Sequence, residues 1–169
     1  MKKLILIAPL VAAAGWWYFV GGRTLTEDNV LAFYKQQEAA TLSRKPEELC
    51  ALLDDEFQAV GVSVFQDQER SDRLNKEQTC QSARDMYKSF EDLGDKMGGI
   101  LQLDYGYSIH KIDISPDKKS ATVDASYSLD VAGSIMNIRS RGIDTLIRRN
   151  GKMLMLRSEG KGSVESGFN

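Results

Sequence analysis

Apolar and polar positions alternate most regularly between Ala121 and Val131. The odd-numbered residues of this stretch are apolar and the even-numbered ones are polar, a pattern typical of a strand with one buried face. Three further strands are predicted over 100–114, 135–149 and 152–159, because the turn at 115–119 and the pair Asn150-Gly151 separate apolar stretches. The C-terminal half therefore predicts a meander of four strands.

The first of these strands changes phase along its length. Its apolar residues are odd-numbered as far as Ile109, whereas Ile112 and Ile114 are even-numbered. A β-bulge near Ser108–Lys111 would explain the switch. Because bulges bend sheets, we expect a bent sheet that wraps around helices.

The N-terminal half predicts helices with recognisable ends. Thr26 and Asn75 are suitable N-caps, and Pro46 suits a first helical position. Apolar residues recur at helical spacing after each of these positions. The predicted elements are helices over 26–43, 46–57 and 75–96, with a short strand over 59–65.

An uncharged apolar segment runs from Leu4 to Gly22, preceded by two lysines. About 19 helical residues span roughly 28 Å, close to the thickness of a bilayer core. Three aromatic residues near the far end suit the membrane interface: Trp16, Trp17 and Tyr18. We predict a membrane anchor over 1–22 and a folded domain over 23–169. A signal peptide cleaved after Ala12-Ala13-Ala14 is the alternative.

Both interpretations place the domain outside the cytoplasm. The two lysines favour a cytoplasmic N-terminus, so we expect a single-pass protein of a bacterial-type inner membrane with its domain facing the periplasm or the cell exterior. Cys50 and Cys80 are the only cysteines, and this location would permit a disulfide between them. Two buried free thiols are the alternative.

Composition narrows the chemistry. The formal net charge of −2 gives no electrostatic reason to expect nucleic-acid binding. One histidine and the absence of a CxxC pair argue against a zinc site. Neither a phosphate loop nor a dinucleotide fingerprint occurs, so no metal or cofactor is expected.

The order of predicted elements is helix, helix, strand, helix and four strands. This order resembles the nuclear transport factor 2-like superfamily, also called SnoaL-like or cone fold. The resemblance rests on the helix containing Val30-Leu31-Ala32-Phe33-Tyr34, the segment from Leu49 to Phe57, the third helix and the strands. It implies an α+β class, with three helices packed on a bent, mostly antiparallel sheet. With the N-terminal transmembrane helix, this is the expected fold.

The resemblance also implies a pocket between the sheet and the helices. The residues expected to line it are aromatic or titratable: Tyr34, Tyr105, Tyr107, His110 and Tyr127. An isomerase of the superfamily uses Asp and Tyr residues in this cavity, and the acids of matching type here are Asp104, Asp113, Asp130 and Asp144. By alternation, Asp104 and Asp130 fall on the polar face of their strands. No aspartate is therefore predicted among the pocket residues, and no catalytic residue is assigned.

These observations favour a membrane-anchored binding or assembly module outside the cytoplasm, without catalytic activity. Its partners would be the membrane and either another protein or a small apolar ligand, and the sequence also allows a homodimer. The alternative is a small-molecule isomerase or dehydratase that uses the cone cavity. An aspartate beside tyrosines in a deep pocket would favour the enzyme.

Overall fold

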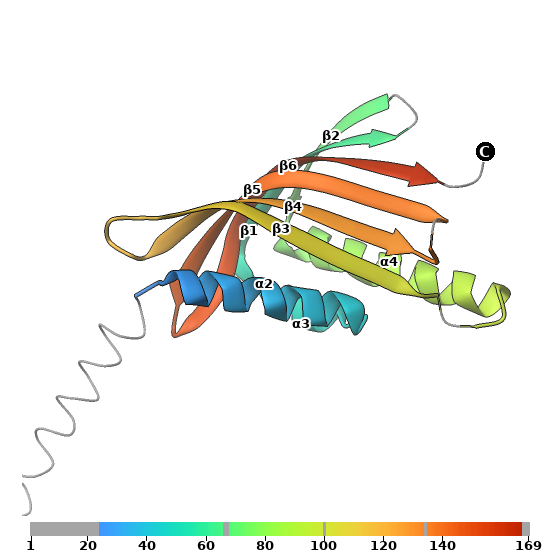
Figure 1. Cartoon of the computed structure of the whole chain (residues 1–169), viewed down its shortest axis with the longest axis horizontal. Coiled ribbons are helices and arrows are strands. Elements are labelled where there is room, and N and C mark those ends of the chain that lie inside the picture. Colours follow the sequence, from blue (N-terminus) through green and yellow to red (C-terminus); the bar gives the residue numbers. More distant parts are fainter. Residues whose placement is uncertain (1–23, 66–67, 100, 134, 167–169) are drawn as a thin grey trace, which may run out of the picture.

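The computed structural model describes residues 24–65, 68–99, 101–133 and 135–166. Helices α2, α3 and α4 lie on one side of a strongly curved sheet (Figure 1). The elements in chain order are α2 (Glu27–Leu42), α3 (Pro46–Cys50), β1 (Leu53–Phe65), β2 (Gln68–Asn75), α4 (Lys76–Lys96), β3 (Leu103–Ile114), β4 (Ser120–Val131), β5 (Met136–Arg149) and β6 (Lys152–Ser166). The α+β class and the bent sheet with three helices are confirmed.

The sheet has six strands in the order β2-β1-β6-β5-β4-β3. Strands β3 to β6 form the predicted antiparallel meander, and β1 is parallel to β6 while β2 is antiparallel to β1. At the turn between β5 and β6, Asn150 and Gly151 both have positive φ, 52° and 77°, as a type I′ turn requires.

A row of small residues crosses the middle of the sheet. Gly61 of β1 pairs with Gly160 of β6, which pairs with Gly142 of β5, which pairs with Ala125 of β4. The row ends at the predicted bulge, where the β3–β4 register shifts between Ile109 and Lys111. The strands bend as they pass over the helices (Figure 1), and small side chains allow neighbouring backbones to approach closely at such a bend.

The predicted helix ends at Thr26 and Asn75 are correct. Thr26 Oγ1 accepts a hydrogen bond from the backbone of Asn29, and Asn75 Oδ1 accepts one from Gln78, each in a reciprocal capping box. Helix α4 ends at Lys96, close to the glycine pair at 98–99. Caps were reliable signals because they depend only on local sequence.

The predicted helix over 46–57 is wrong beyond Cys50. Strand β1 already begins at Leu53, which pairs with Met155 of β6. Backbone pairing also reaches Leu52, whose carbonyl accepts a hydrogen bond from Met155 at 2.8 Å. Hydrogen bonds to β6 thus replace the helical hydrogen bonds. The β1–β6 register shifts between Leu53 and Gln58, and Phe57, which lies in this irregular segment, is buried.

Strand β2 was not predicted. Its sequence, Gln68–Asn75, is almost entirely polar, so it has no apolar alternation to detect. Among the described strands it is an edge strand paired with β1 alone, and charged residues are common on exposed edges because they discourage further pairing.

The predicted anchor over 1–22, with Trp16, Trp17 and Tyr18, lies outside the described residues. Within residues 24–166, gaps excepted, no helix is long and apolar enough to cross a membrane.

The glycine row provides a test of the bend. A Cβ atom at Gly142 would lie 2.5 Å from the backbone oxygen of Glu159, and one at Gly160 would lie 2.6 Å from that of Arg141. Neither backbone atom can move without disturbing the sheet, so we expect Gly142→Ala and Gly160→Ala each to lower the free energy of unfolding by about 1–3 kcal/mol in urea titrations.

Gly61→Ala is the matched control. It lies in the same row, but a Cβ there meets nothing within 4 Å, so we expect a change below about 1 kcal/mol. Equal losses in all three variants would contradict a specific close approach between β5 and β6.

Candidate functional site

The buried apolar residues form two clusters with a cavity between them. One cluster surrounds Phe33, Leu52 and Met155 under β4–β6, and the other surrounds Tyr87 and Leu129 under the far ends of the strands. The cavity has a volume of about 430 Å³, and all five of these residues line it. Cavities of this size, apolar with a few polar groups, are typical of small-molecule sites.

The most unusual side chain in the cavity wall is Asp144 of β5. It is fully buried, with an exposed fraction of 0%. Two phenols hold it: Tyr34 of α2 donates a hydrogen bond to Asp144 Oδ2 at 2.9 Å, and Tyr127 of β4 donates to the same oxygen. The other oxygen, Oδ1, is buried without a hydrogen-bond partner among the described residues. A buried carboxylate oxygen without a partner is costly and calls for an explanation.

Aromatic packing fixes the position of the phenols. The Tyr34 ring stacks on Tyr107 at a centroid distance of 5.5 Å, lies 6.3 Å from the Tyr127 ring and contacts Phe33 edge-on. Burial, reinforced by the Asp144 charge, raises the pKa of Tyr34, Tyr105 and Tyr127 well above the ordinary range. The three hydroxyls therefore remain protonated donors at any physiological pH.

Other polar atoms in the cavity wall also lack partners. Gln37 Oε1 of α2, Thr79 Oγ1 of α4 and the Tyr105 hydroxyl of β3 are buried and unpaired within the described part of the chain, and each residue lines the cavity. Together with Asp144 Oδ1 they are polar contacts that a ligand could complete.

The structure places some of the predicted pocket residues at the cavity and others away from it. Tyr105 and Tyr127 line the cavity, and Tyr34 reaches it through Asp144. Tyr107 is half-buried behind Tyr34. His110 does not belong to the pocket: it is exposed, and its Nε2 lies 2.8 Å from the Ser126 hydroxyl. It sits at the bulge, where the register skips from Ile109 to Lys111.

The expectation that no aspartate lies in the pocket is wrong for Asp144. Strand β5 has apolar residues at both odd and even positions, so its alternation alone did not choose a face. Its pairing with β4 does: Asp144 lies opposite Val123, and Leu146 lies opposite Ala121, both on the buried face. The sequence did contain one indication of this face. Asp144 is even-numbered like the apolar Leu146, whereas the odd-numbered positions include Arg139 and Arg141.

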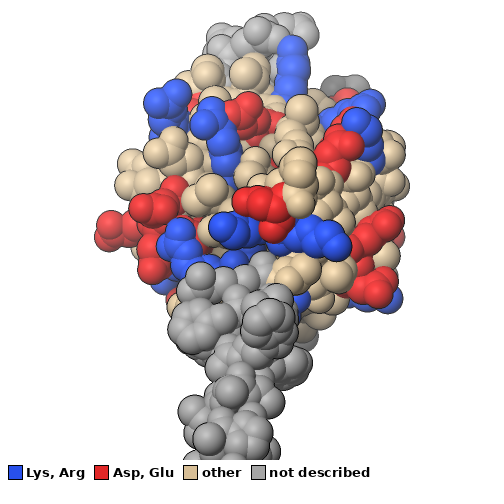
Figure 2. Space-filling view, turned by 90° about the vertical axis from the view of Figure 1, so that its left-hand side faces the viewer, with Lys and Arg blue, Asp and Glu red and all other residues tan. Residues whose placement is uncertain are grey.

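The other aspartates are accounted for elsewhere. Asp104 and Asp113 are exposed, Asp113 is ion-paired with Lys111, and Asp130 with Arg139. Acidic and basic side chains are likewise intermingled on the face shown in Figure 2. Within the described ranges, no group of three His, Cys, Asp or Glu side chains could hold a metal ion.

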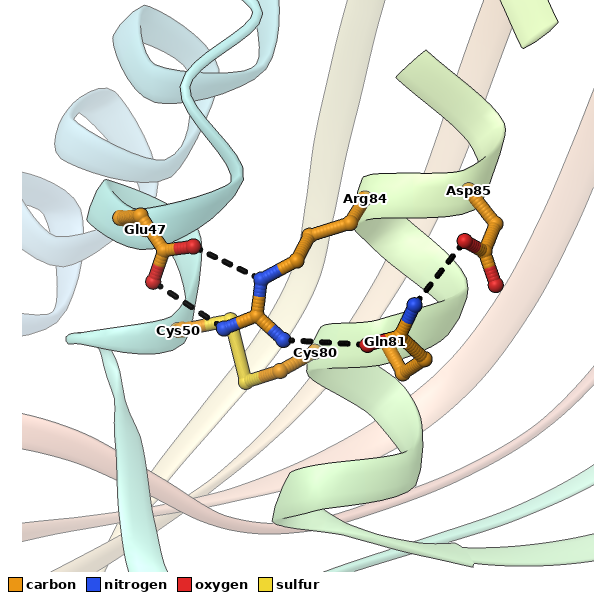
Figure 3. A network of polar contacts seen from close by, with 6 residues as sticks. All are labelled: Glu47, Cys50, Cys80, Gln81, Arg84 and Asp85. Carbon is orange, nitrogen blue, oxygen red and sulfur yellow. Dashed lines mark hydrogen bonds and ion pairs between the residues drawn. A yellow bond between two sulfur atoms is a disulfide. The ribbon is translucent and has the colours of Figure 1, made fainter. Parts of the chain in front are cut away.

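The predicted disulfide between Cys50 and Cys80 is present and forms part of the cavity wall. It joins α3 to α4, and both cysteines are buried. Beside it, the Arg84 guanidinium donates to both carboxylate oxygens of Glu47 at 2.7 and 3.2 Å (Figure 3). Lys76 and Asp55 make a further ion pair between α4 and β1 at 2.8 Å. The disulfide and the Glu47–Arg84 pair thus join α3 to α4, and the Lys76–Asp55 pair joins α4 to β1.

The buried phenols predict a characteristic alkaline unfolding. The folded chain keeps protons on Tyr34, Tyr105 and Tyr127 that the unfolded chain loses above its ordinary tyrosine pKa of 10.0. Stability from these groups is therefore complete below pH 10 and declines as the pH rises further, by up to about 1.4 kcal/mol per pH unit for each phenol. Ultraviolet titration should show part of the phenolate signal appearing only with unfolding.

Tyr34→Phe should make this decline shallower, because it removes one of the protected phenols. Ionisation of every tyrosine near pH 10 with the fold intact would contradict the buried phenol cluster.

No family model matches this sequence, and no curated protein matches it. Solved structures do match its fold. A scytalone dehydratase-like protein from Novosphingobium aromaticivorans has a TM-score of 0.58 at 12% identity, covering 84% of this chain and 87% of its own. An NTF-2-like protein of unknown function from Shewanella oneidensis has a TM-score of 0.54 at 13% identity, with coverages of 79% and 97%.

A ketosteroid isomerase-like protein from Erwinia carotovora atroseptica has a TM-score of 0.50 at 14% identity, covering 82% of this chain and 95% of its own. Such identities establish the fold and leave activity open. The chain has the nuclear transport factor 2-like fold.

Proposed function

We propose that this domain binds a small, mostly apolar molecule in the cavity between its sheet and helices α2 to α4. The apolar walls contributed by Phe33, Leu52 and Met155 would hold the body of the ligand. A few polar groups would fix its orientation. The cavity thus favours a ligand over a protein partner, although the protein partner and the homodimer remain predictions.

One observation carries this proposal: Asp144 is fully buried at the cavity wall, and its Oδ1 atom has no partner in the described chain. Burying an unpaired carboxylate oxygen lowers stability. If this position served only to stabilise the fold, we would expect an apolar residue there. A ligand that completes the hydrogen bonds explains why the position holds an aspartate.

Binding can be measured with an apolar fluorescent dye, N-phenyl-1-naphthylamine. The full-length chain should enhance its fluorescence, and Ala83→Phe should weaken dye binding at least tenfold, because Ala83 of α4 lines the cavity and a phenyl group would occupy its volume. Ala39→Phe is the matched control, since Ala39 is an exposed helical alanine. Equal binding by both variants would place the dye elsewhere and contradict the proposal.

A second candidate function is proton transfer on the bound molecule. The observation that favours it is again Asp144 Oδ1, a buried carboxylate oxygen without a partner among the described residues, in a cavity wall that also contains the protonated phenols of Tyr105 and Tyr127. A base and hydrogen-bond donors are the groups needed to move a proton next to a carbonyl. Exchange of ketone α-hydrogens in D₂O, if it occurs with the full-length chain and is lost in Asp144→Asn, would rank catalysis above simple binding.

We also propose that the domain acts outside the cytoplasm, held by the apolar segment over 1–22. The Cys50–Cys80 disulfide supports this location, because such bonds persist in oxidising compartments. Membrane fractions from bacterial cells expressing the full-length chain, treated at once with a thiol-alkylating reagent, should contain the disulfide-linked form. A chain lacking 1–22 should instead be recovered with both thiols alkylated.

Recovery of free thiols in the full-length chain would contradict the proposed location. A mature N-terminus at Gly15 would keep the location but replace the anchor with a cleaved signal.

A further inference from the structure

The polar atoms of the cavity are unbalanced in favour of hydrogen-bond acceptors. Four of the buried atoms without partners in the described chain belong to residues of the cavity wall. Gln37 Oε1 can only accept, and so can Asp144 Oδ1 when the carboxyl group is ionised. The other two, on Thr79 and Tyr105, are hydroxyls that both donate and accept. A ligand that completes this set must supply donors.

The charged residues of the cavity wall also favour a ligand that supplies donors. None of its lining residues is a lysine, arginine or histidine among those the structure describes, and Asp144 is the only acid. The other buried aspartate, Asp54, has a cationic partner: Arg149 Nη1 lies 3.2 Å from its Oδ2. Within the described ranges, the hydrogen bonds to the Asp144 carboxylate come from the phenols of Tyr34 and Tyr127. A buried negative charge is stabilised most by a paired positive charge.

Both phenols donate to one oxygen of Asp144, Oδ2. This arrangement orients the carboxylate through Oδ2 and leaves Oδ1 without a partner among the described residues. Aromatic rings contribute as well, since Phe33, Tyr87, Tyr105 and Tyr127 all line the space. The faces of such rings attract cations.

We infer that the cavity selects a small amphiphilic amine, whose ammonium group pairs with Asp144 Oδ1 and whose apolar body lies against the aromatic and aliphatic walls. This inference rests on the proposed binding function and specifies its ligand class. It also excludes anionic ligands, because a carboxylate or phosphate would meet the Asp144 charge with no cationic side chain in the described wall to offset it.

Three probes with one carbon skeleton test the charge preference: 4-phenylbutylamine, 4-phenylbutan-1-ol and 4-phenylbutanoic acid. At pH 7 they are a cation, a neutral donor and an anion. Their affinities for the full-length, disulfide-bonded chain can be compared by displacement of N-phenyl-1-naphthylamine. We expect the amine to bind at least tenfold more tightly than the alcohol, and the acid to bind more weakly than either.

The variant Asp144→Asn separates charge from shape. It keeps the size of the side chain and removes its negative charge, so amine affinity should fall at least tenfold while alcohol affinity changes less than threefold. Asp54→Asn is the matched control, because Asp54 is equally buried but lies outside the cavity lining. It should leave the ratio of amine to alcohol affinity unchanged.

Each other outcome is decisive. Equal binding of amine and alcohol, tighter binding of the acid, or an amine preference that survives Asp144→Asn would overturn the amine assignment while the dye still reports a functional cavity. If the dye itself does not bind, or binds equally to Ala83→Phe, the proposed function fails and the amine assignment with it.

Discussion

The bend across the middle of the sheet is the constraint on which the rest of the structure depends. Gly61, Gly160, Gly142 and Ala125 bring four strands together with little side-chain volume, and the bulge in β3 continues the line. Close approach is enforced at Gly142 and Gly160, where a methyl group would collide with backbone. The helices lie on one face of the sheet, where α2 packs against the strand segments before the bend of β4 and α4 packs against those after it, so the apolar core divides into two clusters. The cavity lies where those clusters meet.

The same bend determines what the cavity contains. Asp144 follows Gly142 by two residues and faces inward from β5, opposite Val123. There the first helix passes beneath the sheet, and Tyr34 is close enough to donate to the carboxyl group. Asp144 is fully buried there, and its Oδ1 has no partner among the described residues. The curved sheet thus places a costly buried acid at the wall of a cavity.

The sequence predicted those elements whose signals are local. Capping residues marked the starts of α2 and α4, and alternation marked β4. The switch of the apolar residues from odd to even numbers after Ile109 also located the bulge. Predictions failed where a distant segment decides the outcome. Leu52 and Leu53 have helical spacing with Leu49, but pairing with Met155 makes them extended. Polar β2 exists because β1 offers it an edge.

The site was harder to predict than the fold for the same reason. Tyr34, Tyr105 and Tyr127 could be proposed from parity and from the resemblance to cone-fold proteins. Asp144 could not, because apolar residues at both parities of β5 left its face undecided until the β4–β5 register was known. His110 is the only histidine of the sequence, yet it follows the inward-facing Ile109 at the bulge and lies exposed beside Ser126. The type of each residue indicated the chemistry it could perform. Only the register of the strands showed on which face of the sheet the residue lies.

The walls of the cavity of about 430 Å³ are held on two sides. The Cys50–Cys80 disulfide and the Glu47–Arg84 ion pair fix the two helices to each other, while the backbone contacts at Gly142 and Gly160 fix the opposing sheet. Larger side chains in these walls would fill the space and bury more apolar surface, and the proposed ligand would account for the space that is left between the two walls.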